Sequence, residues 1–387
     1  MRYRLGRKRW ALAILVMISS TSFASSEILF SANDGIETFD DGAYRMIPGK
    51  TESSLTALDI SRMPPQVLWT LPAEQTAAGP PSAVAVTPDG SVAIVTNPAT
   101  RDPIDPKKRL DGKDLQVFDL SSKPPRLAGS VPLDRRPWGV SIDPAGRHGL
   151  IANGDGTVTW LDIDGVHVTV KSVVTLGPAT LQTMSTAFTK DGRWALVTRR
   201  GDASVTVLRI DGDQIEPVRN IVVGSNPYEV MTSPDGQIAA VSDIGHNSGD
   251  RNSVTLIDLR TVPFRAMDVF SVGPTPEGIA FSPDSKMLAV NSINGSNLKH
   301  SDSFYASHSL IQLFDLSARP VRLLATTYAG TNAQGLAFTA DGKFLIVQDF
   351  ASDSLLVFGV STSGLTPLKF QIPIQGAPSG LAVFDSK

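Results

Sequence analysis

The stretch VAVTPDGSVAIVTN, residues 84–97, contains an alternating apolar segment, a Pro-Asp-Gly turn and a second apolar segment. In such a turn Pro fixes φ at the first corner, Asp hydrogen-bonds back to the local backbone, and Gly accepts the exit geometry. The stretch therefore predicts two short antiparallel strands joined by a tight turn.

The same pattern recurs five more times along the chain. The related stretches are VSIDPAGRHGLIAN (140–153), TAFTKDGRWALVTR (186–199), VMTSPDGQIAAVSD (230–243), IAFSPDSKMLAVNS (279–292) and LAFTADGKFLIVQD (336–349). Two further apolar segments follow each turn, for example LIDL (256–259) and VFSVG (269–273). Each repeat therefore predicts four strands, which we label A to D in chain order.

Four-stranded units repeating at intervals of 44 to 57 residues are typical of β-propeller blades. PSGLAVF (378–384) is a seventh strand A with no strand after it. Its partners are expected at the other end of the chain, in EILFSAND (27–34), SLTALDI (54–60) and PQVLWTLP (65–72). Sharing one blade between both ends removes the open sheet edge. The sequence predicts an all-β, seven-bladed propeller of four-stranded blades, forming a single domain over residues 25–387.

Residues 1–24 have the layout of a secretory signal peptide: five basic residues, a short apolar run and a small-residue cleavage pattern ending at Ala24. We expect a periplasmic or secreted protein with no stable membrane anchor after cleavage. Removal of this segment leaves 30 basic and 38 acidic residues, a net charge of −8. That balance disfavours nucleic acid as a partner. A small molecule or a periplasmic protein is the expected partner.

The text AIVTN (93–97), with the turn before it, resembles the repeats of bacterial YVTN-type propellers. More distantly the chain resembles the seven-bladed lactonase family, which includes 6-phosphogluconolactonases and carboxymuconate-cyclising enzymes. VTRRGDASVTVL (197–208) is similar to that family's segment Asn-Arg-Gly-x-x-Ser-Ile, and Arg199 replaces the Asn. The resemblance implies an anion-binding role for Arg200. The family's Glu in strand A of this blade is Ser185 here, and a Glu appears one blade later as Glu229.

In this topology the starts of the A strands and the B–C loops share one face, where binding residues are expected. Two B–C loops are long, 97–114 and 291–309, and lie on opposite sides of the predicted ring. They are either a clamp over the channel mouth or two surface insertions. Near the axis, seven equivalent A-strand positions require small residues, and six are Ala, Gly or Ser. The exception is Glu229.

Polar and aromatic residues immediately precede several of these positions: Tyr228, Glu277, Trp138 and Gln334. We predict that they contribute to ligand binding. Three of the five histidines, His246, His300 and His308, fall on B–C loops of adjacent blades, with acidic residues nearby. With these carboxylates they could bind a divalent metal ion, or one of them could act as a general base. No spacing is that of a metal site and no cofactor motif is present, so neither a metal nor a cofactor is expected.

Two functions of different class remain open. The first is an exported propeller that binds a small molecule or a protein partner at the channel mouth. The second is a lactonase-like hydrolase or isomerase acting on a lactone or sugar-acid compound. In the second, Glu229 and His246 would act as acid and base while Arg200 holds an anion. We predict that Arg200, Glu229 and His246 point into one cavity at this face. If they do not, the expected reading is a propeller whose partner binds elsewhere, such as on the long loops 97–114 and 291–309.

Overall fold

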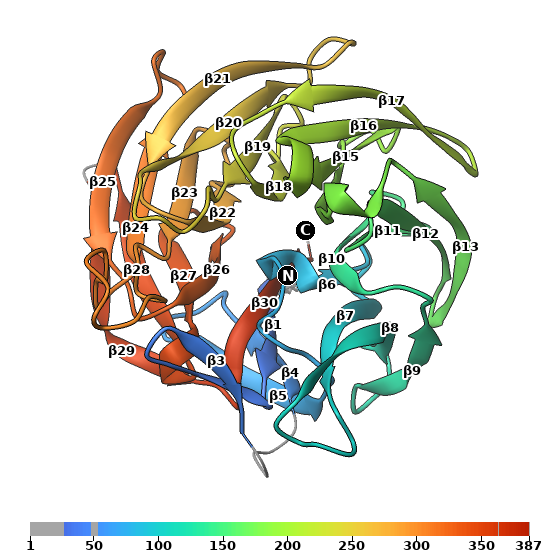
Figure 1. Cartoon of the computed structure of the whole chain (residues 1–387), viewed down its shortest axis with the longest axis horizontal. Helices are drawn as coiled ribbons and strands as arrows, with labels where there is room; N and C mark the ends of the chain where they lie inside the picture. Colours follow the sequence, from blue (N-terminus) through green and yellow to red (C-terminus); the bar gives the residue numbers. More distant parts are fainter. Residues whose placement is uncertain (1–26, 48–52, 363, 387) are drawn as a thin grey trace, which may run out of the picture.

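The computed structural model describes residues 27–47, 53–362 and 364–386. Seven four-stranded antiparallel sheets form a ring around a central axis, as predicted (Figure 1). The predicted signal peptide lies outside the described residues. No helix in the described part of the chain is both long and apolar enough to span a membrane.

Six blades follow one another along the chain, each in the order A–B–C–D. Blades 1 to 3 contain β6–β9 (Val84–Val86, Val92–Arg101, Arg109–Asp119, Arg126–Pro132), β10–β13 (Pro137–Ile142, His148–Asn153, Thr157–Asp164, His167–Thr175) and β14–β17 (Thr183–Phe188, Trp194–Arg199, Ser204–Asp211, Gln214–Val222). Blades 4 to 6 contain β18–β21 (Pro227–Thr232, Ile238–Asp243, Asn252–Asp258, Arg265–Val272), β22–β25 (Pro276–Phe281, Met287–Ser292, Leu310–Asp315, Arg322–Tyr328) and β26–β29 (Ala333–Phe338, Phe344–Asp349, Ser354–Ser361, Gly364–Pro373).

The seventh blade joins the two ends of the chain. Its order is β30 (Ala377–Asp385), β1 (Glu27–Asp34), β4 (Ser54–Asp59) and β5 (Gln66–Pro72). β30 pairs antiparallel with β1, so that Phe30 lies opposite Ala382 and Leu29 opposite Val383. The prediction that the last strand A finds its partners at the start of the chain is confirmed.

The centre of the ring is as crowded as the small-residue pattern predicts. A Cβ atom added at Gly139 would lie 2.6 Å from Ser82 Oγ and 2.9 Å from the Met184 carbonyl oxygen. Between blades, buried apolar side chains form shared clusters, such as Leu196 and Val205 of blade 3 with Ile257 of blade 4. Neighbouring blades therefore contact each other through backbone atoms near the axis and through apolar side chains farther out.

Polar side chains on B strands add a hydrogen bond from one blade to the next. Thr96 Oγ1 donates to the Trp138 carbonyl at 2.6 Å, and Thr198 Oγ1 donates to the Tyr228 carbonyl at 3.0 Å. Gln348 Nε2 donates to the Gly380 carbonyl at 2.8 Å in the closing blade. These bonds satisfy carbonyl groups at the starts of the A strands, where the ladders contain bulges.

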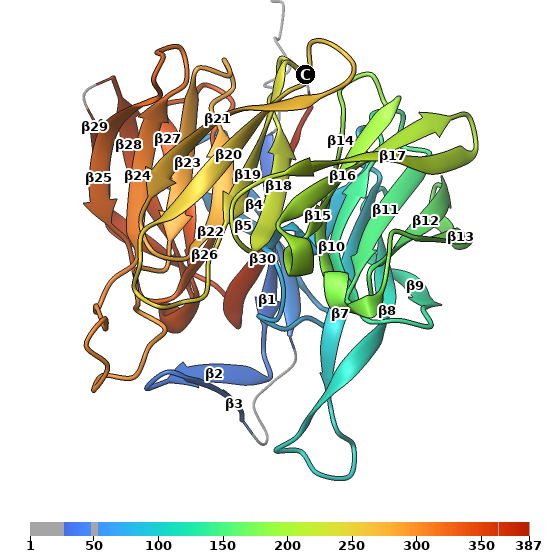
Figure 2. The ribbon, with the colours of Figure 1, turned by 45° about the horizontal axis from the view of Figure 1, so that its top comes forward.

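Three insertions project from one face of the ring (Figure 2). The predicted loop 97–114 is largely an extension of the β7–β8 hairpin, because β7 continues to Arg101 and β8 begins at Arg109. The second insertion is the connection between β23 and β24. The third was not predicted: a hairpin of β2 (Glu37–Asp40) and β3 (Ala43–Met46) lies between β1 and β4. The described ranges also contain four single-turn 3-10 helices, η1 (Pro81–Ala83), η2 (Ala179–Leu181), η3 (Arg200–Asp202) and η4 (Phe350–Ser352).

Candidate functional site

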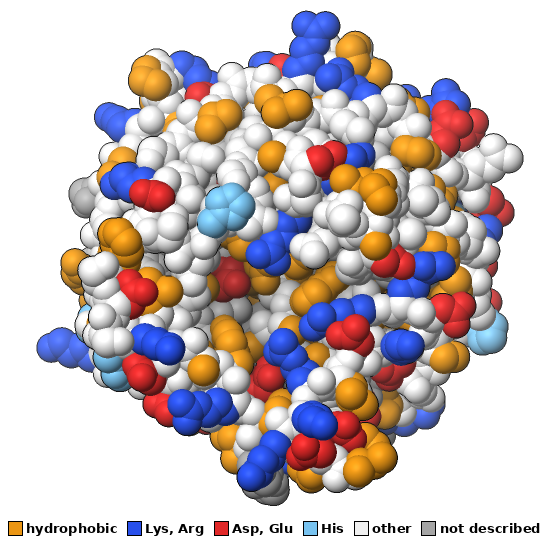
Figure 3. All heavy atoms as spheres, in the orientation of Figure 1, with side chains coloured by type: hydrophobic (Ala, Val, Ile, Leu, Met, Phe, Trp, Pro, Cys, Tyr) orange, Lys and Arg blue, Asp and Glu red, His pale blue; other side chains and the backbone are white. Residues whose placement is uncertain are grey.

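A cavity of about 660 Å³ lies at the channel mouth, on the face that carries the three insertions. In the space-filling view, the centre of this face is hollowed, with acidic and basic side chains along the rim (Figure 3). The described residues supply five cations to its lining, Arg109, Lys113, Arg135, Arg136 and Arg200. They also supply four acidic side chains, Glu37, Asp111, Asp134 and Asp155.

Three of the cavity's arginines are paired with carboxylates. The ion pairs are Arg109–Glu37 at 3.2 Å, Arg136–Asp111 at 3.1 Å and Arg135–Asp155 at 2.5 Å. Within the described ranges, Arg200 and Lys113 have no carboxylate within ion-pair distance. The cavity therefore retains two cations whose charge is available to an anion.

Arg200 is held in place by its own turn. It follows β15 directly and begins η3, where its backbone N–H donates to the Gln182 carbonyl at 3.1 Å. A Cβ at Gly201 would overlap the Thr180 carbonyl oxygen, so this close turn requires glycine after the arginine. Arg200 Nε donates to Asn226 Oδ1 at 2.5 Å. With Nε occupied, the terminal nitrogens of the guanidinium group are left for the cavity.

Trp138 forms part of the cavity wall. The Arg136 guanidinium carbon lies 4.1 Å from the centre of the Trp138 ring, a cation–π arrangement. The backbone also closes on the ring, because Cβ atoms at Gly79 and Gly154 would lie 2.5 Å and 2.7 Å from its atoms. These contacts fix the indole, which packs against the buried cluster that contains Tyr228.

The carboxyl groups of Glu229 and Glu277 lie near the Tyr228 side chain, in the interior of the ring. Glu229 is 4% exposed, and its Oε2 accepts a hydrogen bond from the Ile279 N–H at 2.9 Å. Burial raises the pKa of Glu229 to about 8, and the nearby Glu277 adds to the shift while the Ile279 N–H opposes it. Burial likewise raises the pKa of Glu277 to about 8, opposed by Gln334, Tyr228 and the charge of Arg200. Both groups hold a proton at neutral pH.

The structure brings some of the predicted site residues together and separates others. Arg200, Tyr228 and Trp138 line the cavity, but Glu229 and His246 are not among its lining residues. The prediction that Arg200, Glu229 and His246 point into one cavity is therefore wrong. The Glu229 carboxyl turns toward the backbone of blade 5, where it accepts from an N–H beside the bulge in β22.

The remaining predicted residues lie outside the cavity lining. Gln334 is 1% exposed, and its amide donates to the Asn332 carbonyl at 3.2 Å. His246 Nε2 lies 3.2 Å from Ser225 Oγ. His300 and His308 are exposed on the β23–β24 connection. In the part of the chain that the structure describes, no three or more His, Asp or Glu residues are grouped so as to hold a metal ion.

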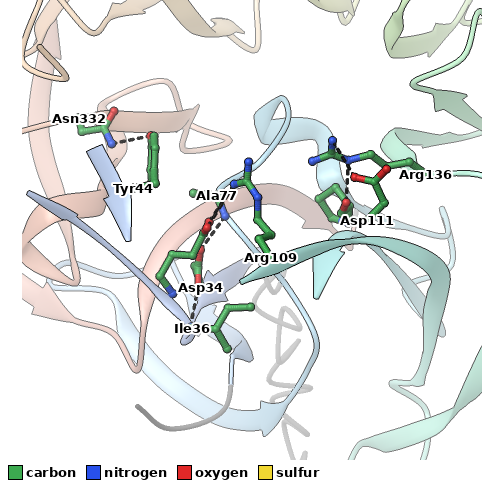
Figure 4. Close-up of polar contacts among 10 residues, drawn as sticks. Asp34, Ile36, Tyr44, Ala77, Arg109, Asp111, Arg136 and Asn332 are labelled. Carbon is green, nitrogen blue, oxygen red and sulfur yellow. Dashed lines mark hydrogen bonds and ion pairs between the residues drawn. The ribbon is translucent and has the colours of Figure 1, made fainter. Parts of the chain in front are cut away.

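The β2–β3 hairpin contacts both long insertions. Glu37 pairs with Arg109 of β8, and Asp41 Oδ1 accepts from the His300 N–H of the β23–β24 connection at 2.7 Å. Tyr44, which also lines the cavity, accepts a hydrogen bond from Asn332 Nδ2 at 2.7 Å (Figure 4). The two loops predicted as a clamp or as surface insertions are thus linked through a third element.

Several residues that line the cavity were not predicted from the sequence, namely Glu37, Tyr44, Arg109, Arg135 and Arg136. A signal for two of them exists in the run DRRPW (134–138), which places two arginines immediately before strand A of blade 2. Because D–A connections end on the same face as B–C loops, such residues also reach the mouth.

Comparison with known proteins supports the architecture. No family model and no curated protein sequence matches the chain. A proposed 6-phosphogluconolactonase from Bacteroides uniformis shares 16% identity with a TM-score of 0.66, covering 93% of this chain and 99% of that one. The periplasmic gluconolactonase PpgL of Pseudomonas aeruginosa shares 18% identity with a TM-score of 0.64, covering 93% and 99%. A functionally unknown protein from Desulfotomaculum acetoxidans has a TM-score of 0.67 at 14% identity, covering 92% and 98%.

At these identities the likeness shows the fold alone. The chain is a seven-bladed β-propeller whose structural neighbours include lactonase-like proteins. The finer resemblance to YVTN-type repeats is not confirmed by a family model.

Proposed function

We propose that the protein binds a small anionic molecule in the cavity at the channel mouth. The observation that carries the proposal is Arg200: its turn and Asn226 fix the guanidinium at the cavity wall, with no carboxylate paired to it in the described structure. A guanidinium with free terminal nitrogens is suited to a carboxylate or a phosphate. The cavity volume of about 660 Å³ is in the range of small-molecule sites.

The rest of the lining favours a ligand with several hydroxyl groups. Asp134 has no ion-pair partner in the described ranges, and its carboxylate can accept hydrogen bonds from hydroxyls. Trp138 and Tyr228 add flat apolar surface to a lining that is otherwise rich in charge. A polyhydroxylated acid, such as a sugar acid, matches this combination of one anionic group, hydroxyls and C–H surface.

A lactonase-like activity is the second candidate. It is favoured by structural likeness to a gluconolactonase over 93% of the chain. The positions of the acidic groups argue for binding over hydrolysis, because neither Glu229 nor Glu277 is among the residues that line the cavity. Glu229 is also committed to the Ile279 N–H.

We further propose that the protein is exported and meets its ligand, or a protein partner, in the periplasm. The pattern of residues 1–24 and the net charge of −8 that remains without them support this proposal.

Isothermal titration calorimetry with D-gluconate tests the binding proposal, with the neutral polyol D-glucitol as the ligand control. We expect gluconate to bind, glucitol to bind at least about tenfold more weakly, and Arg200→Gln to lose at least about tenfold in affinity for gluconate. Arg193→Gln is the matched control, because Arg193 is an exposed arginine in the A–B turn of the same blade. Equal binding of gluconate by wild type and Arg200→Gln would refute the proposal. Release of acid from glucono-δ-lactone at a rate that depends on the protein would favour the second candidate.

A further inference from the structure

We infer that Arg109 is a second anion-binding residue of this cavity and that Glu37 is its internal competitor. A ligand with a second anionic group must displace the Glu37 carboxylate to reach the Arg109 guanidinium. The inference rests on the proposed function, because it assigns a ligand class, the dianions, to the same cavity. It concerns a different element, the β2–β3 hairpin.

The Glu37–Arg109 pair uses little of the arginine's bonding capacity. One nitrogen, Arg109 Nη1, donates to both Glu37 oxygens, at 3.2 Å and 3.4 Å. A well-formed pair uses two guanidinium nitrogens at about 2.7–2.9 Å. Within the described residues, Arg109 Nε and Nη2 have no hydrogen-bond partner. A carboxylate that could approach freely would therefore bind Arg109 better than Glu37 does.

The pair also lies between two hollows. Glu37, Tyr44 and Arg109 line the cavity of about 660 Å³ and also a second hollow of about 520 Å³. Lys107 and Arg45, which pairs with Asp40, contribute to the second hollow, so its charge attracts anions. Moving Glu37 away from Arg109 would join the two hollows and expose the free guanidinium nitrogens to the ligand.

The backbone of Glu37 is held in place by the Asp34 side chain. Asp34 Oδ1 accepts from the Glu37 N–H at 2.9 Å, and Asp34 Oδ2 accepts from the Ala77 N–H at 2.8 Å (Figure 4). The Glu37 side chain itself is only 3% exposed, and Arg109 is its one ion-pair partner in the described structure. The backbone of Glu37 is therefore anchored by Asp34, while its carboxylate is held by Arg109.

Burial disfavours the charge on Glu37. It raises the pKa of Glu37, and the charges of Arg109 and Arg136 oppose the shift. The other titratable groups that face Glu37 are Asp34 of β1 and Tyr44 of β3. Acidification neutralises Glu37 at a higher pH than an ordinary Glu, and this releases Arg109 for a ligand.

The test compares D-gluconate, which has one carboxylate, with D-glucarate, which has a carboxylate at each end. In calorimetry we expect Glu37→Gln to bind glucarate about tenfold more tightly than wild type and to gain distinctly less affinity for gluconate, whose single carboxylate binds Arg200. Arg109→Gln should abolish the gain when combined with Glu37→Gln. Unchanged or weaker glucarate binding by Glu37→Gln would overturn the inference.

A second measurement needs no variant. The ratio of wild-type affinities for glucarate and gluconate should rise as the pH is lowered from 8 toward 5, because burial raises the pKa of Glu37 and so favours loss of its charge at a higher pH than for an ordinary Glu. Groups that affect both ligands equally cancel in this ratio. If the ratio of the two affinities does not change with pH, Glu37 does not compete with the ligand for Arg109. If gluconate binds but the ratio and Glu37→Gln show no effect, only this inference fails; if neither ligand binds wild type, the proposed function fails with it.

Discussion

Arg200 of blade 3 and Asn226, at the start of blade 4, are joined by a 2.5 Å hydrogen bond from Nε to Oδ1. Asn226 adopts a φ of +63° and donates its own amide to the Gly245 carbonyl at 2.5 Å. The arginine is therefore oriented by a side chain that is itself anchored in the next blade. This arrangement orients the guanidinium before the proposed ligand binds.

Asn226→Gly should weaken binding of D-gluconate by about three- to tenfold. Glycine keeps the positive φ, so the substitution removes the amide that orients Arg200 without adding backbone strain. Calorimetry measures the affinity, and a melting curve should show only a small loss of stability. Unchanged affinity would mean that Arg200 needs no positioning partner.

Gly139→Ala should destabilise the protein by about 1–3 kcal/mol, because its Cβ would lie 2.6 Å from Ser82 Oγ and 2.9 Å from the Met184 carbonyl oxygen. Gly129→Ala is the matched control, since nothing lies within 4 Å of a Cβ at that position. Urea titration measures both. Equal stabilities of the two variants would show that the ring centre is less crowded than described.

Deletion of residues 377–387 should lower the melting temperature by at least about 10 °C and promote aggregation. The deletion removes β30 and leaves β1 with an unpaired edge. Deletion of residues 386–387 alone is the control, because these residues follow the strand. If both truncations melt at the same temperature, the two ends of the chain do not stabilise one another.

Stability should fall as the pH rises from about 5 to about 8. The folded-state pKa values of Asp34, Glu229 and Glu277 are raised, to about 7, 8 and 8, chiefly by burial. Between these pH values the folded protein keeps protons that the unfolded chain has already released. The stability that these carboxyl groups contribute is therefore complete below their pKa in the unfolded chain and is lost as the pH rises through their pKa in the folded protein. Glu229→Gln should flatten the decline in a series of melting curves. A slope identical to that of wild type would show that Glu229 is ionised in the folded protein.

The proposed export requires the mature protein to begin near Ser25, because Ala24 ends a small-residue pattern that fits a signal peptidase site. N-terminal sequencing or intact-mass measurement checks this. Recovery of a chain that still begins at Met1 would contradict cleavage.

The fold could be predicted because its signals are local and repeated. Each Pro-Asp-Gly turn predicts that the strands on either side of it pair. The PSGLAVF segment has no strand after it in the sequence, which predicts that it pairs with a strand at the start of the chain. The β2–β3 hairpin occupies the B–C connection of the closing blade, as the other two insertions do in theirs, but its strands belong to no repeated pattern, so repetition could not reveal it. The direction of the Glu229 side chain depends on an N–H donor in the next blade, at Ile279, which no local pattern encodes.

The cavity could be predicted only in part for the same reason. Arg200 was predicted from the resemblance of VTRRGDASVTVL (197–208) to a segment of the lactonase family, whereas Tyr228 and Trp138 follow from the strand order. Arg109 and Glu37 meet across two insertions that are 72 positions apart in the sequence. Their pairing depends on how the insertions fold over the mouth, and neither insertion carries a motif that specifies this.

A crystal structure of the protein with D-gluconate, at a concentration that saturates binding in solution, would show whether Arg200 holds the ligand's carboxylate. We predict that a carboxylate oxygen of gluconate lies about 2.7–3.2 Å from a terminal guanidinium nitrogen of Arg200, with the hydroxyl groups toward Trp138 and Asp134. Gluconate bound elsewhere on the molecule, or bound in the cavity with its carboxylate away from Arg200, would contradict the account.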